Sequence, residues 1–312
     1  MFTVTVFGGT GFFGRRLVRR LVAEGARVRV AVRHAERARA ALHADGLDQV
    51  AVFRADVRDP NSLVAALAGA DAVVNAVSGY VEKRGVTFEA IHVQGAEAVA
   101  RRAAEAKLTR CVLISGIGAD PKSGSPYIRA RGCGELAVQR AFPQATIVRP
   151  GVMFGPGDAL FGTLADFARL LPILPLIGSG RTRLQPIYVE DVVEAVCRIL
   201  INPGARGQTY ELAGPQTYTM RELVVLTLQL AGKRRLLMTI PFAIADVLAW
   251  LLEFLPNPPL TTSQVDLLKA DNVASGALPG FQDLGIEPEP VEEVVPTYIS
   301  RSRIPRSHAA GT

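Results

Sequence analysis

The stretch TVTVFGGTGFFG, residues 3–14, indicates how the chain folds, because an apolar strand leads into a glycine-rich turn that opens a helix. Its glycines follow the spacing G-x-x-G-x-x-G. A tight turn needs a positive φ angle, a bound pyrophosphate needs close approach of the backbone, and the helix must begin near the strand; glycine meets each demand. The amino terminus of the helix then faces the phosphates. The stretch therefore predicts a dinucleotide-binding turn that contains Gly8, Gly11, Phe12, Phe13 and Gly14.

Strands and helices alternate throughout residues 1–150. After the glycine turn, Leu17, Val18, Leu21 and Val22 form an apolar stripe at a spacing of four, which is typical of a helix with one buried face. Strict alternation of strand and helix predicts a parallel, doubly wound sheet with right-handed crossovers. We therefore expect an α/β Rossmann fold with strands at residues 3–8, 26–33, 49–56, 71–78, 110–116 and 145–150.

The sequence changes in character after Pro150. Segments 149–162 and 170–180 are rich in glycine and proline, as in irregular loops over a cleft. Helical patterns then dominate and indicate a smaller, mainly helical C-terminal domain. We expect an NAD(P)-binding Rossmann domain at residues 1–150 with residues 184–213 returning to it, a small domain at 151–183 and 214–300, and a basic tail at 301–312.

Three helix starts in this second part carry the pattern of a capping box, in which a cap residue and a Glu or Gln three positions later bond each other's backbone. The predicted pairs are Asp191 with Glu194, Thr219 with Glu222, and Thr261 with Gln264.

Length and composition describe a chain with a large core, since 312 residues are 49% hydrophobic and 21% charged. No run reaches the roughly 18 to 20 apolar residues that a spanning helix needs, and the first residues lack the pattern of a secretory signal. We expect a cytoplasmic location. Cys111, Cys133 and Cys197 are too far apart for a disulfide framework or metal spacing, and the four histidines are scattered, so no metal site is predicted.

The net charge of +6 comes partly from basic clusters at residues 15–20, 33–40 and 301–312. Aromatic residues are not interleaved with these clusters, as they would be on a nucleic-acid surface. We therefore expect no nucleic-acid partner. An anionic nucleotide, an acidic partner or a negatively charged membrane surface remain as candidates.

The end of the second strand bears on the identity of the nucleotide. An NAD-binding unit usually has an Asp or Glu there, which binds the ribose 2′-hydroxyl. In this chain Val32, Arg33 and His34 occupy the region, so a cation stands where a 2′-phosphate would lie, and Arg15 is a second candidate contact. The absence of an acid with the presence of Arg33 favours NADP(H) over NAD(H), although either arginine alone would also suit a solvated surface. Asp56, next to Val57 after the third strand, is expected to accept a hydrogen bond from the adenine amine.

These features resemble the short-chain dehydrogenase/reductase superfamily, in its extended or atypical branch. The resemblance rests on GGTGFFG, Asp56, the segment 73–78, Ser115, the Tyr127 helix and RPGVMFGPGD at 149–158. A closer similarity, over SPYIRARGCGE, LQPIYVEDV, PPLTTSQVDLLKADNV and DLGIEP, is to the family of the NADPH-binding accessory subunit of respiratory complex I and its bacterial relatives. It extends to about residue 300.

The resemblance implies a catalytic group of Ser115, Tyr127 and Arg131, with one departure: Arg131 stands where the superfamily has a lysine. A cation four residues after the tyrosine shares its helix face and favours the phenolate. At about 6 Å and an effective dielectric constant near 20, one charge contributes roughly 3 kcal/mol, or about two pKa units. The planar guanidinium changes the geometry, however, so a nucleotide pocket without chemistry is an equal alternative.

Family resemblance also implies a role for the nucleotide and a set of partners. It adds Asn75, Ala76, Pro150, Tyr127 and Arg131 to the cofactor-binding residues. The family binds NADP(H) as a structural cofactor, which implies complex I subunits as partners and a place at the inner face of the membrane. Two alternatives stay open: an active NADP-dependent oxidoreductase on a small or lipophilic carbonyl, such as a quinone or its precursor, and a sensor of nucleotide ratio. Whether the chain is an enzyme, and on which substrate, stays open too.

The segment PFAIADVLAWLLEFLP, residues 241–256, is apolar except for Asp246 and Glu253, which share one narrow face. Two interpretations follow: a helix buried in the C-terminal domain, or a docking face for a membrane or a partner.

Overall fold

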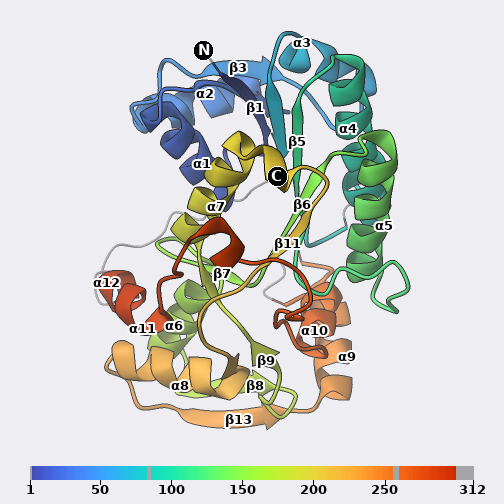
Figure 1. The fold of residues 1–312 in the computed structure, drawn as a ribbon. Coiled ribbons are helices and arrows are strands. Elements are labelled where there is room, and N and C mark those ends of the chain that lie inside the picture. The colour runs from blue at the N-terminus through green and yellow to red at the C-terminus, as the bar shows by residue number, and fades with distance from the viewer. Residues whose placement is uncertain (1, 83–85, 256–259, 300–312) are drawn as a thin grey trace.

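The structure is a computed structural model that describes residues 2–82, 86–255 and 260–299. It has two parts, one above the other in Figure 1. The larger is a sheet covered by helices on both faces, and the smaller joins helices to short strands. The basic tail expected at residues 301–312 lies outside the described residues.

A seven-stranded sheet forms the centre of the larger part, in the order β11-β6-β5-β4-β1-β2-β3. All pairings within it are parallel, as for Val6 opposite Val30 and Val74. The order reverses direction between β1 and β4, which is the point where doubly wound folds bind nucleotides. The predicted Rossmann architecture is therefore confirmed. The strands are β1 Thr3–Phe7, β2 Arg27–Val32, β3 Ala51–Arg54, β4 Ala72–Asn75, β5 Arg110–Ile114, β6 Thr146–Pro150 and β11 Thr209–Leu212.

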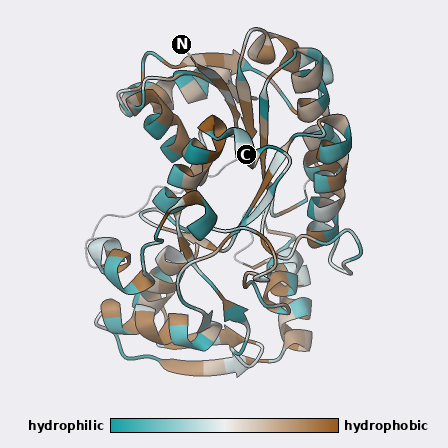
Figure 2. Ribbon diagram, in the orientation of Figure 1, coloured by the Kyte–Doolittle hydropathy of each residue, from teal (hydrophilic) through white to brown (hydrophobic). Residues whose placement is uncertain are grey.

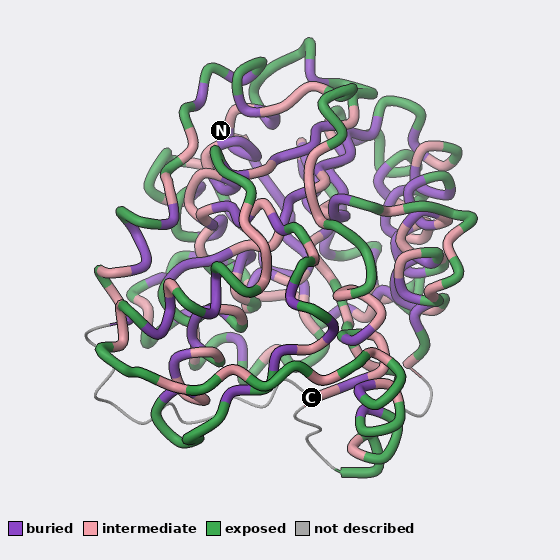
Figure 3. The backbone as a smooth tube through the Cα atoms, turned by 90° about the horizontal axis from the view of Figure 1, so that it is seen from below, coloured by how far each residue is buried: buried purple, intermediate pink, exposed green. Residues whose placement is uncertain are grey.

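Helices cover both faces of this sheet and make two separate cores. One face packs against α1 Phe12–Ala23, α2 Ala35–Ala44 and α7 Val189–Ile201. The other packs against the helical segments that follow β3, β4 and β5. Buried stretches accordingly lie inside and exposed ones at the periphery (Figure 3). The second face carries η1 Pro60–Leu63, α3 Val64–Leu67, the π-helical turn η2 Glu89–Gly95, α4 Ala96–Glu105 and α5 Pro126–Ala141.

Helix α1 shows why the sequence folds in this way. Leu17, Val18 and Leu21 are buried as the spacing predicts, and Val22 is half-buried at the edge of the stripe. The arginines of α1 lie on its outer side and pair with acids there, as Arg20 does with Glu24 and Glu194. One apolar face and one charged face thus fix how the helix lies on the sheet.

The smaller part is mainly helical with short pairs of strands. Its largest pair is β8 Ile173–Ile177 beside β13 Leu236–Ile240, which run parallel. The others are β7 Met153–Phe154 with β10 Ile187–Tyr188, and β9 Arg183–Leu184 with β12 Tyr218–Thr219. The helical segments are α6 Phe161–Leu170, α8 Met220–Leu230, α9 Phe242–Leu252, α10 Thr262–Leu268, η4 Gln282–Leu284, α11 Val291–Val294 and α12 Pro296–Ile299. The turn η3 Pro203–Ala205 instead follows α7 and contributes Ala205 to the core of the large sheet.

Residues 184–213 connect the two parts. Helix α7 packs on α1, and β11 pairs with β6 at the edge of the large sheet. Helix α7 thus packs on the Rossmann sheet, and β11 is one of its strands. We therefore propose that 184–213 belongs to the Rossmann domain, with 151–183 and 214–300 forming the smaller one.

Two of the three predicted capping boxes are present, at Thr219 with Glu222 and at Thr261 with Gln264. The third is wrong. Helix α7 begins at Val189, with Tyr188 as its N-cap, three residues before the predicted cap. Asp191 instead accepts a hydrogen bond from the distant backbone N–H of Glu289 at 2.8 Å.

Candidate nucleotide-binding site

The glycine turn has the geometry that its spacing predicts. Gly8 has a φ of +78°, and a Cβ there would lie 2.7 Å from the carbonyl oxygen of Ala76. A Cβ on Gly14 would lie 2.1 Å from the carbonyl oxygen of Gly8, so α1 begins directly against β1. Gly11 is the exposed N-cap of α1, and the first turn of this helix has no acidic residue. The first N–H groups of α1 therefore suit an anion.

The two phenylalanines of the turn differ in what they offer. The side chain of Phe13 is buried in the core, so only its backbone is available to a ligand. Phe12 is half-buried, and the guanidinium of Arg16 lies 4.4 Å from the centre of its ring.

At the carboxyl ends of β2 and β3 the structure brings Arg33 and Asp56 together. Arg58, which the sequence analysis missed, forms paired hydrogen bonds of 2.6 to 3.2 Å with the Asp56 carboxylate. These bonds hold the pKa of Asp56 below its usual value, and the charge of Arg33 lowers it further. Arg15 is paired with a different acid, since its Nε lies 3.2 Å from Oδ2 of Asp45.

The remaining predicted cofactor residues lie at the same edge of the sheet. Val57 is buried in the core after β3. Asn75, at the end of β4, is buried and its Oδ1 accepts a hydrogen bond from the Val77 N–H at 3.2 Å. Ala76 presents its carbonyl to the glycine turn, and Pro150 is buried at the end of β6.

Tyr127 is enclosed by aromatic side chains and is only 1% exposed. The ring centres of Tyr80, Phe88 and His92 lie 5.3 to 5.4 Å from its own. Among the described residues its hydroxyl has no hydrogen-bond partner of acceptable geometry, although Ser78 and Tyr80 lie close enough to affect its pKa. Burial raises this pKa well above its usual value. The phenol is therefore a poor proton donor in this arrangement, and little of the phenolate that could accept a proton is present at neutral pH.

Arg131 lies over the Tyr127 ring, with its guanidinium carbon 5.2 Å from the ring centre. Its charge lowers the pKa of Tyr127 in the direction that the sequence analysis predicts, but the effect of burial is larger. Its Nη2 donates a hydrogen bond to the backbone carbonyl of Ser115. A Cβ on Gly116 would lie 2.3 Å from Nη1, so a glycine at 116 makes room for the guanidinium.

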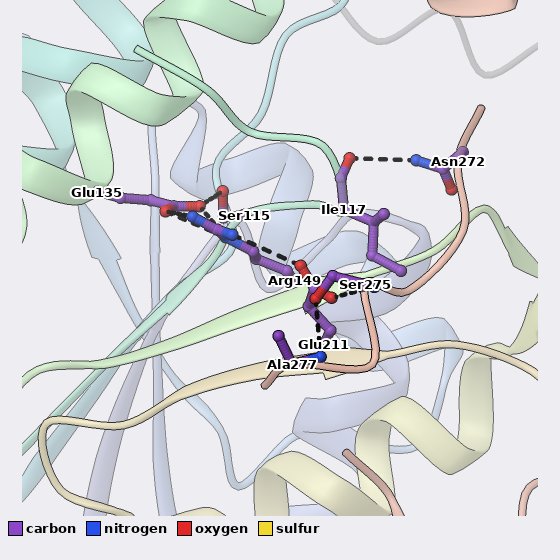
Figure 4. A network of polar contacts seen from close by, with 8 residues as sticks. All are labelled: Ser115, Ile117, Glu135, Arg149, Glu211, Asn272, Ser275 and Ala277. Carbon is purple, nitrogen blue, oxygen red and sulfur yellow. Dashed lines mark hydrogen bonds and ion pairs between the residues drawn. The ribbon is translucent and has the colours of Figure 1, made fainter. Parts of the chain in front are cut away.

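The Ser115 hydroxyl is not directed at a substrate, because it donates a hydrogen bond to Glu135 (Figure 4). Glu135 is buried and accepts three further hydrogen bonds from Arg149, of 2.6 to 3.2 Å. On its other side, Nη1 of Arg149 lies 3.6 Å from Oε1 of buried Glu211. Oε2 of Glu211 accepts a hydrogen bond from the Ser275 N–H at 2.6 Å.

This network joins α5, β6 and β11 to the segment around residue 275, and the sequence analysis did not predict it. Asn272 adds a bond from its side chain to the Ile117 carbonyl at 3.2 Å (Figure 4). Two buried carboxylates that share one arginine are stable only while all three groups remain paired. The network thereby holds the segment around residue 275 against the carboxyl ends of β5 and β6.

His92 lies in the π-helical turn η2 beside Tyr127. Burial, with a contribution from the charge of Arg131, lowers the pKa of His92 to about 4. Its Nε2 lies 3.1 Å from the Gly79 carbonyl oxygen. Helix α5 crosses η2 closely, since a Cβ on Gly134 would lie 1.9 Å from the His92 carbonyl. His92 is therefore neutral at physiological pH, and its place in the packing is structural.

The space beside Ser115 and Arg131 is small. A cavity of about 10 Å³ lies there, which is room for roughly one water molecule. It is lined by Val77, Ile91, His92, Ala96, Leu113, Ile114, Ser115 and Arg131.

The chain is similar in sequence to several curated proteins. NADH dehydrogenase (ubiquinone) 1 alpha subcomplex subunit 9, mitochondrial, of Arabidopsis thaliana is 36% identical over 91% of this chain and 74% of its own length. The ceramide reductase of Caulobacter vibrioides is 37% identical over 62% of this chain and 61% of its own length.

Among solved structures, the UDP-glucose 4-epimerase of Thermus thermophilus in complex with NAD superposes with a TM-score of 0.72. It is 19% identical, and the match covers 97% of this chain and all of the epimerase, which supports the fold alone. The model of the NAD dependent epimerase/dehydratase family matches residues 4–213. With the glycine turn, the strand order and this match in agreement, the chain belongs to the NAD dependent epimerase/dehydratase family.

Proposed function

We propose that this protein is an NADP(H)-binding accessory protein of a respiratory NADH:quinone oxidoreductase, in which the nucleotide is mainly structural. The partners are the complex I subunits, and the location is peripheral, at the cytoplasmic face of the membrane. The similarity to the Arabidopsis thaliana complex I subunit over 91% of the chain supports this role. In this proposal the nucleotide lies along the carboxyl ends of β1 to β6, with its pyrophosphate at Gly8, Gly11 and Gly14.

The observation that carries the proposal is that each group of the expected catalytic set is engaged elsewhere. The Ser115 hydroxyl bonds Glu135, Arg131 bonds the Ser115 carbonyl, and Tyr127 is buried with a raised pKa. A reductase needs a tyrosine that exchanges a proton with a substrate oxygen. The cavity beside Ser115 and Arg131 holds about one water, and Tyr127 does not line it.

The charges at the end of β2, where the adenosine ribose would lie, support NADP(H) as the nucleotide. Arg33 is exposed at the end of β2, and residues 32–34 include no Asp or Glu that could bind a 2′-hydroxyl. Arg58 is paired with Asp56, whereas the exposed Arg33 is available to a 2′-phosphate. A structural nucleotide would stabilise the fold by mass action, by about 2.7 kcal/mol at a hundredfold excess over its dissociation constant.

A second candidate is an NADP-dependent oxidoreductase on a lipophilic carbonyl. One observation favours it, the 37% identity to the ceramide reductase of Caulobacter vibrioides over 200 residues. In that case Tyr127 would become the proton donor after a movement that opens its aromatic enclosure, and Arg131 would stand in for the lysine.

Membranes from the native cell test the proposal. The protein is tagged at its own locus, the membranes are solubilised mildly, and native electrophoresis compares the tag with NADH dehydrogenase activity. Co-migration with the active complex is expected. Migration as a free small protein would overturn the proposed role and favour the oxidoreductase.

A further inference from the structure

Helix α9 buries small residues and exposes large apolar ones, which is the reverse of a helix in a protein core. Its buried residues are the small Ala245 and Ala249, four apart, which pack against Val265 of α10. Most of its large apolar side chains point outward, and Trp250 is 57% exposed, whereas Phe242 packs against the buried cluster. The interpretation of 241–256 as a buried helix is therefore wrong for α9. The exposed apolar residues of α9 and the turn after it are Ile244, Val247, Leu248, Trp250, Leu251, Phe254 and Leu255.

The strand that leads into α9 extends this apolar surface. In the β8–β13 pair, Leu174 and Leu176 are buried against α6 and α8, whereas Leu236, opposite Ile173, is 72% exposed. Ile173, Leu236 and Met238 thus form an uncovered sheet face that continues into α9 through Pro241. Figure 2 shows hydrophobic residues along β13 and α9 at the end of the molecule away from the Rossmann sheet. We call this the α9 surface.

The acidic side chains near the α9 surface are paired, whereas basic side chains beside it are exposed. Both acids near α9 are engaged toward α10: Asp246 lies 2.8 Å from the ammonium of Lys269, and Glu253 accepts bonds from the Thr262 N–H and hydroxyl at 2.8 Å. Lys233 and Arg234 are exposed just before β13, two to three residues from Leu236. Cations therefore border the apolar face, while Asp246 is ion-paired and Glu253 is hydrogen-bonded on the side toward α10.

We propose that the α9 surface docks on an anionic lipid bilayer, with α9 and the outer face of β13 lying in the interface. Large apolar side chains, a tryptophan and bordering cations are the features by which a helix binds in the plane of a negatively charged membrane. Among the described residues, no helix is long and apolar enough to cross a membrane.

A lipid fits this surface better than a protein does. Protein interfaces carry about one hydrogen bond per 100–200 Å², and the outward side chains of α9 offer a single polar group, the indole N–H of Trp250. The inference does not depend on the proposed complex, because an isolated chain would bind lipid in the same way.

Trp250 is the single tryptophan of the chain, so its fluorescence reports this surface alone. The purified full chain is mixed with vesicles of phosphatidylcholine, with and without phosphatidylglycerol. We expect flotation with the anionic vesicles, a blue shift of the tryptophan emission, and quenching by lipids brominated near the headgroup. Unshifted emission with no flotation would overturn the inference.

A matched pair of variants locates the contact. Val247→Glu places a charge at the centre of the α9 surface, and Val64→Glu makes the same change at a similarly exposed position of α3. We expect Val247→Glu to weaken vesicle binding roughly tenfold or more, Lys233→Glu to reduce the preference for anionic lipid, and Val64→Glu to change neither. Equal loss in both glutamate variants would contradict the assignment.

A second copy of the chain is the competing occupant. Sedimentation showing a concentration-dependent dimer that Val247→Glu abolishes, without vesicle binding, would overturn the lipid assignment. Vesicle binding by a chain that does not co-migrate with the respiratory complex would retain this inference while removing the proposed function.

Discussion

The guanidinium of Arg131 donates a hydrogen bond to the backbone carbonyl of Ser115, which ties the Tyr127 helix to the end of β5. In the superfamily that this chain resembles, a lysine at this position serves the nicotinamide ribose and a proton relay. Here the cation holds the backbone instead, in space that Gly116 leaves by having no side chain. The relationship explains how an arginine is accommodated at this position.

Arg131→Lys is the first test of this interpretation. Lysine cannot reproduce the fork of the guanidinium, so we expect a loss of roughly 1 kcal/mol of folding stability from the missing bond. We expect no NADPH oxidation with a panel of quinones and lipophilic ketones, followed by absorbance. A large gain in turnover, abolished by adding Tyr127→Phe, would identify a working reductase.

Arg33→Ala tests the assignment of the 2′-phosphate contact. Loss of a charge-assisted bond of roughly 1.5–3 kcal/mol weakens NADPH binding by about tenfold or more and leaves NADH binding unchanged. Calorimetry with both nucleotides measures the difference. Arg37→Ala, at an exposed arginine of α2, is the control. An equal loss of affinity for NADPH and NADH would show that Arg33 does not contact the 2′-phosphate.

His92 predicts a pH dependence of stability. Its folded pKa of about 4 lies below the unfolded value of 6.5, so the unfolded state binds more protons between these values. The contribution of His92 to the free energy of unfolding is therefore greatest above pH 6.5, and it falls by about 3 kcal/mol as the pH is lowered toward 4. Denaturant titrations of wild type and His92→Asn should diverge in this window, with the variant less sensitive to acid. Parallel curves would assign the acid sensitivity to other groups.

Arg149→Met tests the buried network. Removing the shared cation leaves Glu135 and Glu211 buried without it, which costs about 3–5 kcal/mol at neutral pH. The loss should shrink in acid, because protonated carboxyls no longer need the charge. Arg140→Met, on the exposed side of α5, should change stability by less than about 0.5 kcal/mol. A neutral effect of Arg149→Met would mean that the carboxylates find other partners.

Local patterns in the sequence were sufficient for much of the fold. The glycine spacing at 8–14, the strand alternation and the capping boxes at Thr219 and Thr261 all involve residues within a few positions of one another. The cap predicted at Asp191 failed for the opposite reason, since a backbone N–H from 98 residues away binds that carboxylate.

The candidate site was less accessible to prediction because its contacts are long-range. Glu135, Arg149 and Glu211 come from three elements that only the finished sheet brings together. Burial of Tyr127 likewise depends on Tyr80 and Phe88, which no spacing relates to it. The outward face of α9 was ambiguous because composition gives the hydrophobicity of a helix but not the side that packs.

The most direct test of the proposed structural NADP(H) site is to identify the nucleotide that the protein carries when it is purified from its own cells. The native chain is purified without added nucleotide and unfolded, and the released nucleotide is identified and counted by chromatography. Gly14→Ala, whose Cβ would meet the Gly8 carbonyl, should carry none, while Gly124→Ala, in open space, should match wild type. We predict close to one NADP(H) per chain, retained through purification. Recovery of NAD(H), or of no nucleotide from the folded wild-type protein, would contradict a structural NADP(H) site.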